Sequence, residues 1–186
     1  KGLDFGNTRV NLRYNPSLTW FSDREEDDND LHHELEAGLH HDFSERVYLA
    51  VKETFRLAEY PELIGGDGED TSVVLRENTD FIYNSLLARL GVAVSEQVTT
   101  SFSARHILLS YDDDDVGAVR DYDKVVIGGD VGYLVNPQNT ASAELRYADT
   151  DYDLDERDAE SVQVGGSWRT ILGPNTVASV RAGFET

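Results

Sequence analysis

Apolar and polar residues alternate most clearly within residues 140–167 of this chain. Every second residue of Ala141–Tyr147 is apolar, while the positions between them include Glu144 and Arg146. A period of two is typical of a β-strand whose two faces meet different surroundings. Residues 162–168 repeat this pattern after an acidic connection. We therefore predict a β-hairpin here, and most of the chain copies it.

The same alternation predicts about nine strands and an all-β fold. They lie at residues 9–21, 31–42, 46–57, 81–94, 98–111 and 124–135, in the two arms of the hairpin, and at 176–185. Consecutive strands are close enough to pair in chain order, which predicts an antiparallel up-and-down meander. No stretch indicates a helix longer than one turn. The strand at 98–111 is the least regular, and we expect its register to change near residues 105–107.

The connections between these strands alternate strictly between short and long. The short ones lie at 43–45, 95–97, 136–138 and 173–175, and the long ones at 23–30, 59–80, 112–123 and 149–160. In a meander, all short connections lie at one end of the sheet and all long ones at the other. The long connections hold 26 of the 36 acidic residues, so one end is predicted to be strongly negative.

Composition narrows the possibilities further. The 186 residues contain no cysteine, which excludes disulfides and thiolate metal sites, and the formal net charge is −20. Such a charge argues against a nucleic-acid partner, which would require clustered Lys and Arg. We expect a single domain, 1–186, and the start at Lys1 fits a processed chain or one truncated at one or both ends.

The basic residues are unevenly placed within the strands. Ten of the sixteen fall on the polar face: Arg9, Arg13, Lys52, Arg56, Arg89, Arg105, Lys124, Arg146, Arg169 and Arg181. A Lys or Arg facing lipid near the bilayer midplane costs about 2–4 kcal/mol. If the apolar face meets lipid, the basic residues are therefore on the side where they cost least. Glu53, Asn84 and His106 interrupt the apolar faces and fit neither a lipid-facing nor a buried surface.

In its alternation, its loop asymmetry and its Tyr and Trp residues near strand ends, the chain resembles the bacterial outer-membrane β-barrel class, including porin-like barrels. The aromatic residues are Tyr14, Trp20, Tyr133, Tyr147 and Trp168. The resemblance implies a meander that closes into a transmembrane β-barrel in the bacterial outer membrane. It also implies a porin-like pore or structural barrel, not an enzyme, with short periplasmic turns and long acidic extracellular loops. The implied partners are the lipid bilayer and lipopolysaccharide.

Two departures from that class bear on closure. Bacterial single-chain barrels have even strand numbers, whereas nine are predicted here. The class also usually ends on an aromatic residue, whereas this chain ends Phe184-Glu185-Thr186. Both departures leave open a miscount, missing strands, or a barrel completed by a protein partner or additional copies.

In a barrel of this class, the polar faces of the strands line the interior. The residues expected there are Arg13, His32, Glu34, Glu36, His40, Lys52, Arg56, Arg89, Arg105, Asp130, Glu144, Arg146, Arg169 and Arg181. No catalytic residues are predicted, because no nucleophile and base stand at a readable spacing.

The acidic connections are candidate calcium sites, because calcium prefers carboxylate oxygens. The candidate ligands are Asp112, Asp113, Asp114, Asp115, Asp149, Asp151, Asp153 and Glu160. Residues 149–160 imitate the spacing of an EF-hand loop, but Leu154 stands where that motif requires Gly. We expect no cofactor beyond loosely bound calcium, and a solvated acidic rim is the alternative.

A second interpretation of the whole chain stays open. A soluble sheet protein that buries its apolar face also shows alternation. The chain would then be a secreted or surface-exposed β-sheet binding module with acidic, calcium-binding loops.

Overall fold

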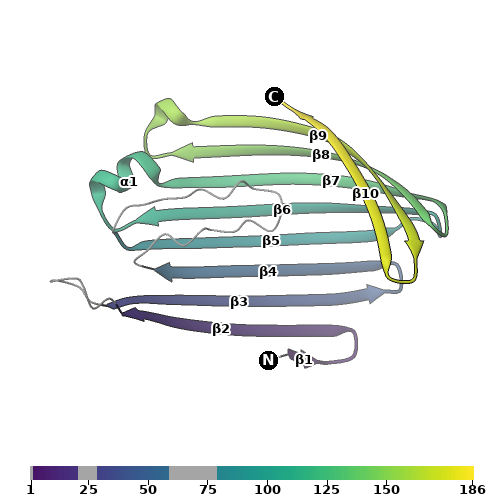
Figure 1. The fold of residues 1–186 in the computed structure, drawn as a ribbon, viewed down its shortest axis with the longest axis horizontal. Helices are drawn as coiled ribbons and strands as arrows, with labels where there is room; N and C mark the ends of the chain where they lie inside the picture. The colour runs from purple at the N-terminus through teal and green to yellow at the C-terminus, as the bar shows by residue number, and fades with distance from the viewer. Residues whose placement is uncertain (1, 21–28, 59–78) are drawn as a thin grey trace.

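The computed structural model describes residues 2–20, 29–58 and 79–186, and these residues form one antiparallel sheet. Its strands are β1 (Gly2–Asp4), β2 (Thr8–Trp20), β3 (Asn29–Ser44), β4 (Val47–Ala58), β5 (Phe81–Ala93), β6 (Val98–Tyr111), β7 (Tyr122–Asn136), β8 (Asn139–Tyr152), β9 (Ala159–Gly173) and β10 (Thr176–Glu185). Each strand pairs with its neighbours in chain order, as Figure 1 shows. The prediction of an all-β antiparallel meander is confirmed.

The connections separate by length, as expected from the sequence. Among the described residues, the short turns after β3, β5, β7 and β9 lie at one end of the sheet (right in Figure 1), and the helix α1 (Asp114–Arg120) lies at the other. The predicted long connections at 23–30 and 59–80 fall largely outside the described residues.

The prediction was wrong about the number of strands and about the absence of a helix. The nine predicted strands correspond to β2–β10, and the prediction missed β1, whose three residues pair with Arg9–Asn11. A segment of three residues is too short to display a period. The prediction also missed α1, because four consecutive aspartates resemble a loop. Asp113 is in fact its N-cap, and its side chain accepts hydrogen bonds from the backbone N–H groups of Asp115 and Val116.

Two further details of register differ from the prediction. β6 pairs residue by residue with both neighbours through residues 105–107, so the expected change of register there is wrong. The connection predicted at 149–160 is shorter than expected, because β8 and β9 extend into it and pair Asp149 with Glu160. A short 3₁₀ turn, η1 (Asp155–Arg157), occupies what remains.

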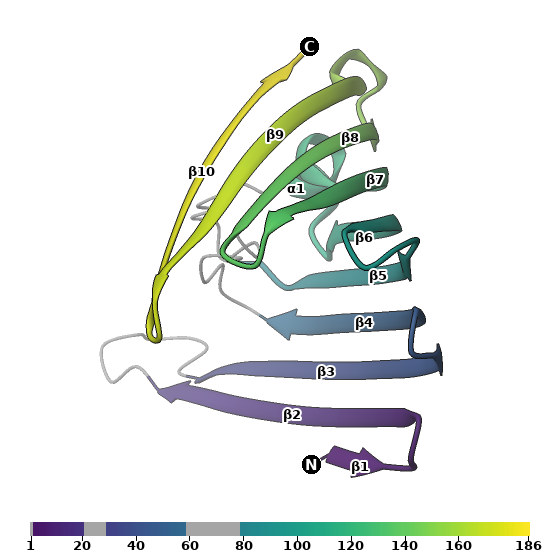
Figure 2. The same cartoon turned by 90° about the vertical axis from the view of Figure 1, so that its right-hand side faces the viewer.

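The sheet is curved, and its two faces differ. Figure 2 shows β9 and β10 bending toward the side on which α1 lies. We call that side the concave face and the other the convex face. Within the described residues the sheet is open, since β1 and β10 stand at its two edges and do not pair with each other. Closure into a barrel is therefore not part of this fold as described.

The small buried core lies on the concave face, at the end where α1 packs. It consists of Ala58, Phe81, Tyr83, Ile107, Leu109 and Tyr111, with Val116 of α1 and Tyr122 against it. The large apolar residues of the convex face are exposed instead, for example Leu86 at 41% and Val164 at 53%. The apolar faces of the strands thus lie on the convex side of the sheet, where many of their side chains are exposed.

Candidate functional site: a charged concave face and an apolar convex belt

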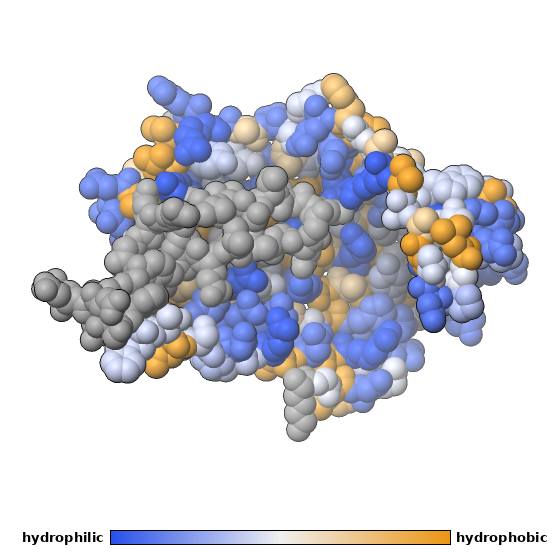
Figure 3. Space-filling model, viewed as in Figure 1, coloured by the Kyte–Doolittle hydropathy of each residue, from blue (hydrophilic) through white to orange (hydrophobic). Residues whose placement is uncertain are grey.

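Every residue predicted to line an interior lies on the concave face. The strand register places there Arg13, His32, Glu34, Glu36, His40, Lys52, Arg56, Arg89, Arg105, Asp130, Glu144, Arg146, Arg169 and Arg181. Figure 3 looks onto this face and shows hydrophilic residues gathered within the curve of the sheet. The alternation of period two determined this placement, since successive side chains of a strand point to opposite faces.

The first ion-pair network joins β2, β3 and β4. Arg13 Nη2 lies 3.1 Å from Glu34 Oε1 and 3.0 Å from Glu36 Oε2. Arg56 Nε donates to the other oxygen of Glu34 at 2.9 Å, and its guanidinium carbon lies 5.9 Å from the centre of the Tyr83 ring. Two arginines therefore neutralise these two carboxylates.

The second network joins β8 and β10 across the strand between them. Glu144 Oε1 accepts a hydrogen bond of 2.7 Å from Arg181 Nε, and Glu144 Oε2 accepts one of 3.2 Å from Arg146. The Glu144 side chain passes over Gly165 of β9, where a Cβ would lie only 2.5 Å from Glu144 Oε1. The absence of a side chain at Gly165 is what lets this carboxylate reach two strands away.

Two other arginines of this face, Arg89 and Arg105, have no such partners among the described residues. No described carboxylate forms an ion pair with Arg89 or Arg105. The Nε of Arg89 is buried and has no hydrogen-bond partner among the described residues, while Arg105 Nε donates to Ser85 Oγ at 3.1 Å. Asp130, further along the face, accepts a hydrogen bond from the Ser101 hydroxyl.

The sequence analysis did not single out the apolar cluster on this polar face. Phe81, Ile107 and Leu109 fall on concave positions, where the alternation predicts polar residues. A signal was present, because residues 107–109 are three consecutive apolar residues, and such a run indicates burial on both faces of a strand. The cover on the concave side includes Val116 of α1.

The apolar side chains of the convex face form a belt that crosses the strands obliquely. One row of residues lies opposite one another from β2 to β9: Val10, Leu39, Val51, Ala88, Ala104, Ile127, Tyr147 and Val162. In β2 the belt extends from this row toward the long connections, as far as Trp20. In β9 the belt extends from this row toward the short turns, as far as Trp168. Toward the long connections it ends at Glu160.

The shift of this belt from one strand to the next gives the angle between the strands and the normal of the belt. Relative to the row of opposite residues, the border near the long connections shifts by about ten residues between β2 and β9, from Trp20 to Val162. The border near the short turns shifts by about six, from Val10 to Trp168, so the belt moves by close to one residue per strand. With a rise of about 3.3 Å per residue and a strand spacing of about 4.8 Å, the strands lie roughly 30–45° from the normal of the belt. Along β5 the belt spans Ile82 to Val92, which is about 33 Å of strand and about 25 Å along that normal.

The polar residues Glu53, Asn84 and His106, which interrupt the belt, are paired with polar groups. Asn84 Nδ2 donates to Glu53 Oε1 at 3.1 Å, and His106 Nε2 lies 2.8 Å from Asp123 Oδ2. Glu53 lies near the middle of the belt in β4, whereas Asp123 lies at its border. The pairing satisfies hydrogen-bonding groups that are costly to leave alone in apolar surroundings.

The predicted calcium ligands do not come together as one group. Asp112–Asp115 surround the start of α1, and Asp149 and Glu160 form a cross-strand pair. Asp149, followed by burial, Asp158 and Asp123, raises the pKa of Asp151. Within residues 2–20, 29–58 and 79–186, no three His, Asp or Glu side chains are arranged to hold a metal ion.

Comparison with known proteins adds no assignment, because no family model, curated protein or solved structure matches this chain. No helix in the described part of the chain is long and apolar enough to cross a membrane.

Proposed function

We propose that this chain is an outer-membrane β-barrel protein of the porin-like kind, a pore or a structural barrel, whose charged concave face lines the interior. The oblique belt on the convex face carries this proposal. Transmembrane β-barrels have strands tilted by about 35–45° and an apolar band about 25 Å tall. The angle and height of the belt agree with both values.

A sheet embedded in lipid must have both edges paired, because unpaired backbone groups cost several kcal/mol each in hydrocarbon. The proposal therefore requires that the edges at β1 and β2 and at β10 pair with each other or with strands of another copy. Short turns would face the periplasm, and the end that carries α1 and the acidic connections would face outward.

Two adjacent residues of β9 offer a direct test. Val164 lies near the middle of the belt on the convex face, and Gln163 points to the concave face. If the convex face meets lipid, Val164→Arg costs about 2–4 kcal/mol and Gln163→Arg costs little. The measurement is the fraction of protein that folds into lipid vesicles, read from a heat-sensitive shift in gel mobility.

A protein that is monodisperse in plain buffer, and that tolerates Val164→Arg as readily as Gln163→Arg, would support the soluble binding module instead. For a protein that does insert, conductance across the vesicle membrane distinguishes a pore from a filled structural barrel. Small barrels near eight strands are filled by side chains, and larger ones leave a channel.

A further inference from the structure

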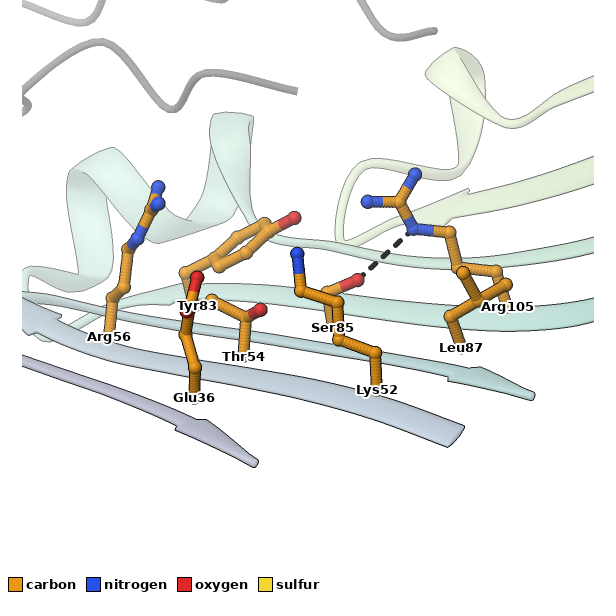
Figure 4. A pocket seen from close by; sticks show the side chains of 8 residues that line it. All are labelled: Glu36, Lys52, Thr54, Arg56, Tyr83, Ser85, Leu87 and Arg105. Atoms are coloured by element: carbon orange, nitrogen blue, oxygen red, sulfur yellow. Dashed lines mark hydrogen bonds between the residues drawn. The ribbon is translucent and has the colours of Figure 1, made fainter. Parts of the chain in front are cut away.

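A pocket on the concave face adjoins the first ion-pair network and shares Glu36 and Arg56 with it. Strands β3, β4, β5 and β6 contribute to its lining, and Figure 4 shows side chains that rise from the sheet on one side. Its charged and hydroxyl groups belong to Glu36, Lys52, Thr54, Arg56, Tyr83, Ser85 and Arg105. Three cationic side chains thus share the pocket with one carboxylate.

The carboxylates of Glu36 and Glu34 are already engaged by Arg13 and by the pocket residue Arg56. Glu36 accepts from Arg13 at 3.0 Å, and Glu34, next to the pocket, accepts from both Arg13 and Arg56. Arg105 forms no ion pair with any carboxylate of residues 2–20, 29–58 and 79–186. Among the residues that the structure describes, Arg105 is therefore a pocket cation whose charge no carboxylate offsets.

Arg105 is held in a defined orientation. Its Nε donates to Ser85 Oγ at 3.1 Å, as the dashed line in Figure 4 marks, and Ser85 is only 6% exposed. Ser85 lies opposite the buried Ile107 on β6, so the hydroxyl has little freedom to move. This anchor uses only Nε, and Figure 4 shows the two terminal nitrogens of the guanidinium pointing away from Ser85.

We propose that this pocket binds a small oxyanion, such as a carboxylate or a phosphate. The planar guanidinium of Arg105 matches two oxygens of such a group, and Lys52 adds a point charge. Tyr83, 7% exposed, and Ser85 also line the pocket and supply hydroxyl donors. The inference rests on the proposed function, because it treats the pocket as a binding station on the inner wall of the barrel.

The test is calorimetric titration of the full chain, folded in detergent, with inorganic phosphate and with succinate at constant ionic strength. Titration with chloride measures the nonspecific binding of anions to positive charge. Arg105→Gln is expected to weaken oxyanion binding by roughly tenfold or more, since it removes a bidentate charged donor. Ser85→Ala, which frees Arg105 without changing the charge, is expected to weaken binding by roughly threefold or more.

Arg9→Gln is the matched control. It removes the same charge from the same face, but Arg9 pairs with Asp42 at 3.5 Å and lies outside the pocket. Binding that falls with Arg105→Gln and stays within about twofold with Arg9→Gln supports the site. The probe that binds more tightly, phosphate or succinate, then identifies the class of oxyanion.

Equal losses in the two variants, or chloride heats equal to those of the oxyanions, would overturn the inference in favour of a diffuse positive field. Absence of binding in a chain that still inserts into vesicles overturns the site alone. Binding that persists in a chain that never inserts overturns the proposed function alone.

Discussion

Asn84 donates a hydrogen bond of 3.1 Å to Glu53 in the middle of the apolar convex belt. The two side chains come from neighbouring strands and lie diagonally, because Asn84 is opposite Phe55 and Glu53 is opposite Leu86. If the convex belt faces lipid, as the proposed function requires, a carboxylate near its centre is costly. The Asn84 amide supplies the donor that makes this position tolerable.

This pair leads to the first prediction. Asn84→Leu removes the donor and leaves Glu53 unsatisfied, which is expected to destabilise the protein in vesicles by about 1–3 kcal/mol. The double variant Glu53→Leu with Asn84→Leu is expected to be at least as stable as the original chain. Urea unfolding measures both variants. If the single substitution costs no more than the double one, the hydrogen bond has no role in stability.

The second prediction concerns the passage of Glu144 over β9. Gly165→Ala would place a Cβ 2.5 Å from Glu144 Oε1, so the carboxylate must withdraw from Arg181. We expect a loss of about 1–3 kcal/mol in unfolding free energy, and faster amide exchange in the edge strand β10.

Gly166→Ala is the control for that substitution. A Cβ at Gly166 would lie 3.6 Å from its nearest neighbour, which is an ordinary contact. Adding Glu144→Gln to Gly165→Ala is expected to cost little more, because both changes break the same interaction. Full additivity of the two effects would contradict this account.

The third prediction compares two leucines on opposite faces. Leu109 is 4% exposed in the concave cluster under α1, and Leu145 is 56% exposed in the convex belt. Leu109→Ala is expected to cost about 2–5 kcal/mol of unfolding free energy. Leu145→Ala creates no cavity, so it is expected to cost far less. Similar losses at the two positions would show that the convex face is buried against protein.

The fourth prediction is a pH dependence at the end of β8, beyond the belt. The neighbouring Asp149 raises the pKa of Asp151 above its usual 3.8, so ionised Asp151 is disfavoured in the folded state. The folded protein then binds more protons than the unfolded chain between 3.8 and the raised pKa, and its stability falls as the pH rises through that window.

Asp151→Asn removes this penalty. The variant is expected to be more stable than the original chain at neutral pH and to lose that advantage below pH 3.8. Thermal unfolding at low salt measures the difference, since salt screens exposed charges. Asp4→Asn, in the distant strand β1, controls for the loss of one negative charge. An equal gain from Asp4→Asn would assign the effect to net charge rather than to Asp149.

The sequence alone determined the strands from β2 to β10, their order and the face on which each side chain lies. Side chains of a strand alternate strictly, so the pattern around Ala141–Tyr147 is sufficient to assign faces without any tertiary contact. The charged residues of the concave face were identified for the same reason.

Only the tertiary structure decided which groups meet across strands. The register brings Asn84 to Glu53 and Glu144 to Arg181, and a shift of two residues would leave the alternation unchanged while separating both pairs. The helix α1 and the cluster around Leu109 depend on contacts distant in sequence, which a local period cannot encode. The oblique belt likewise exists only when neighbouring strands are aligned, because its drift is a relation between strands and not a property of any one of them.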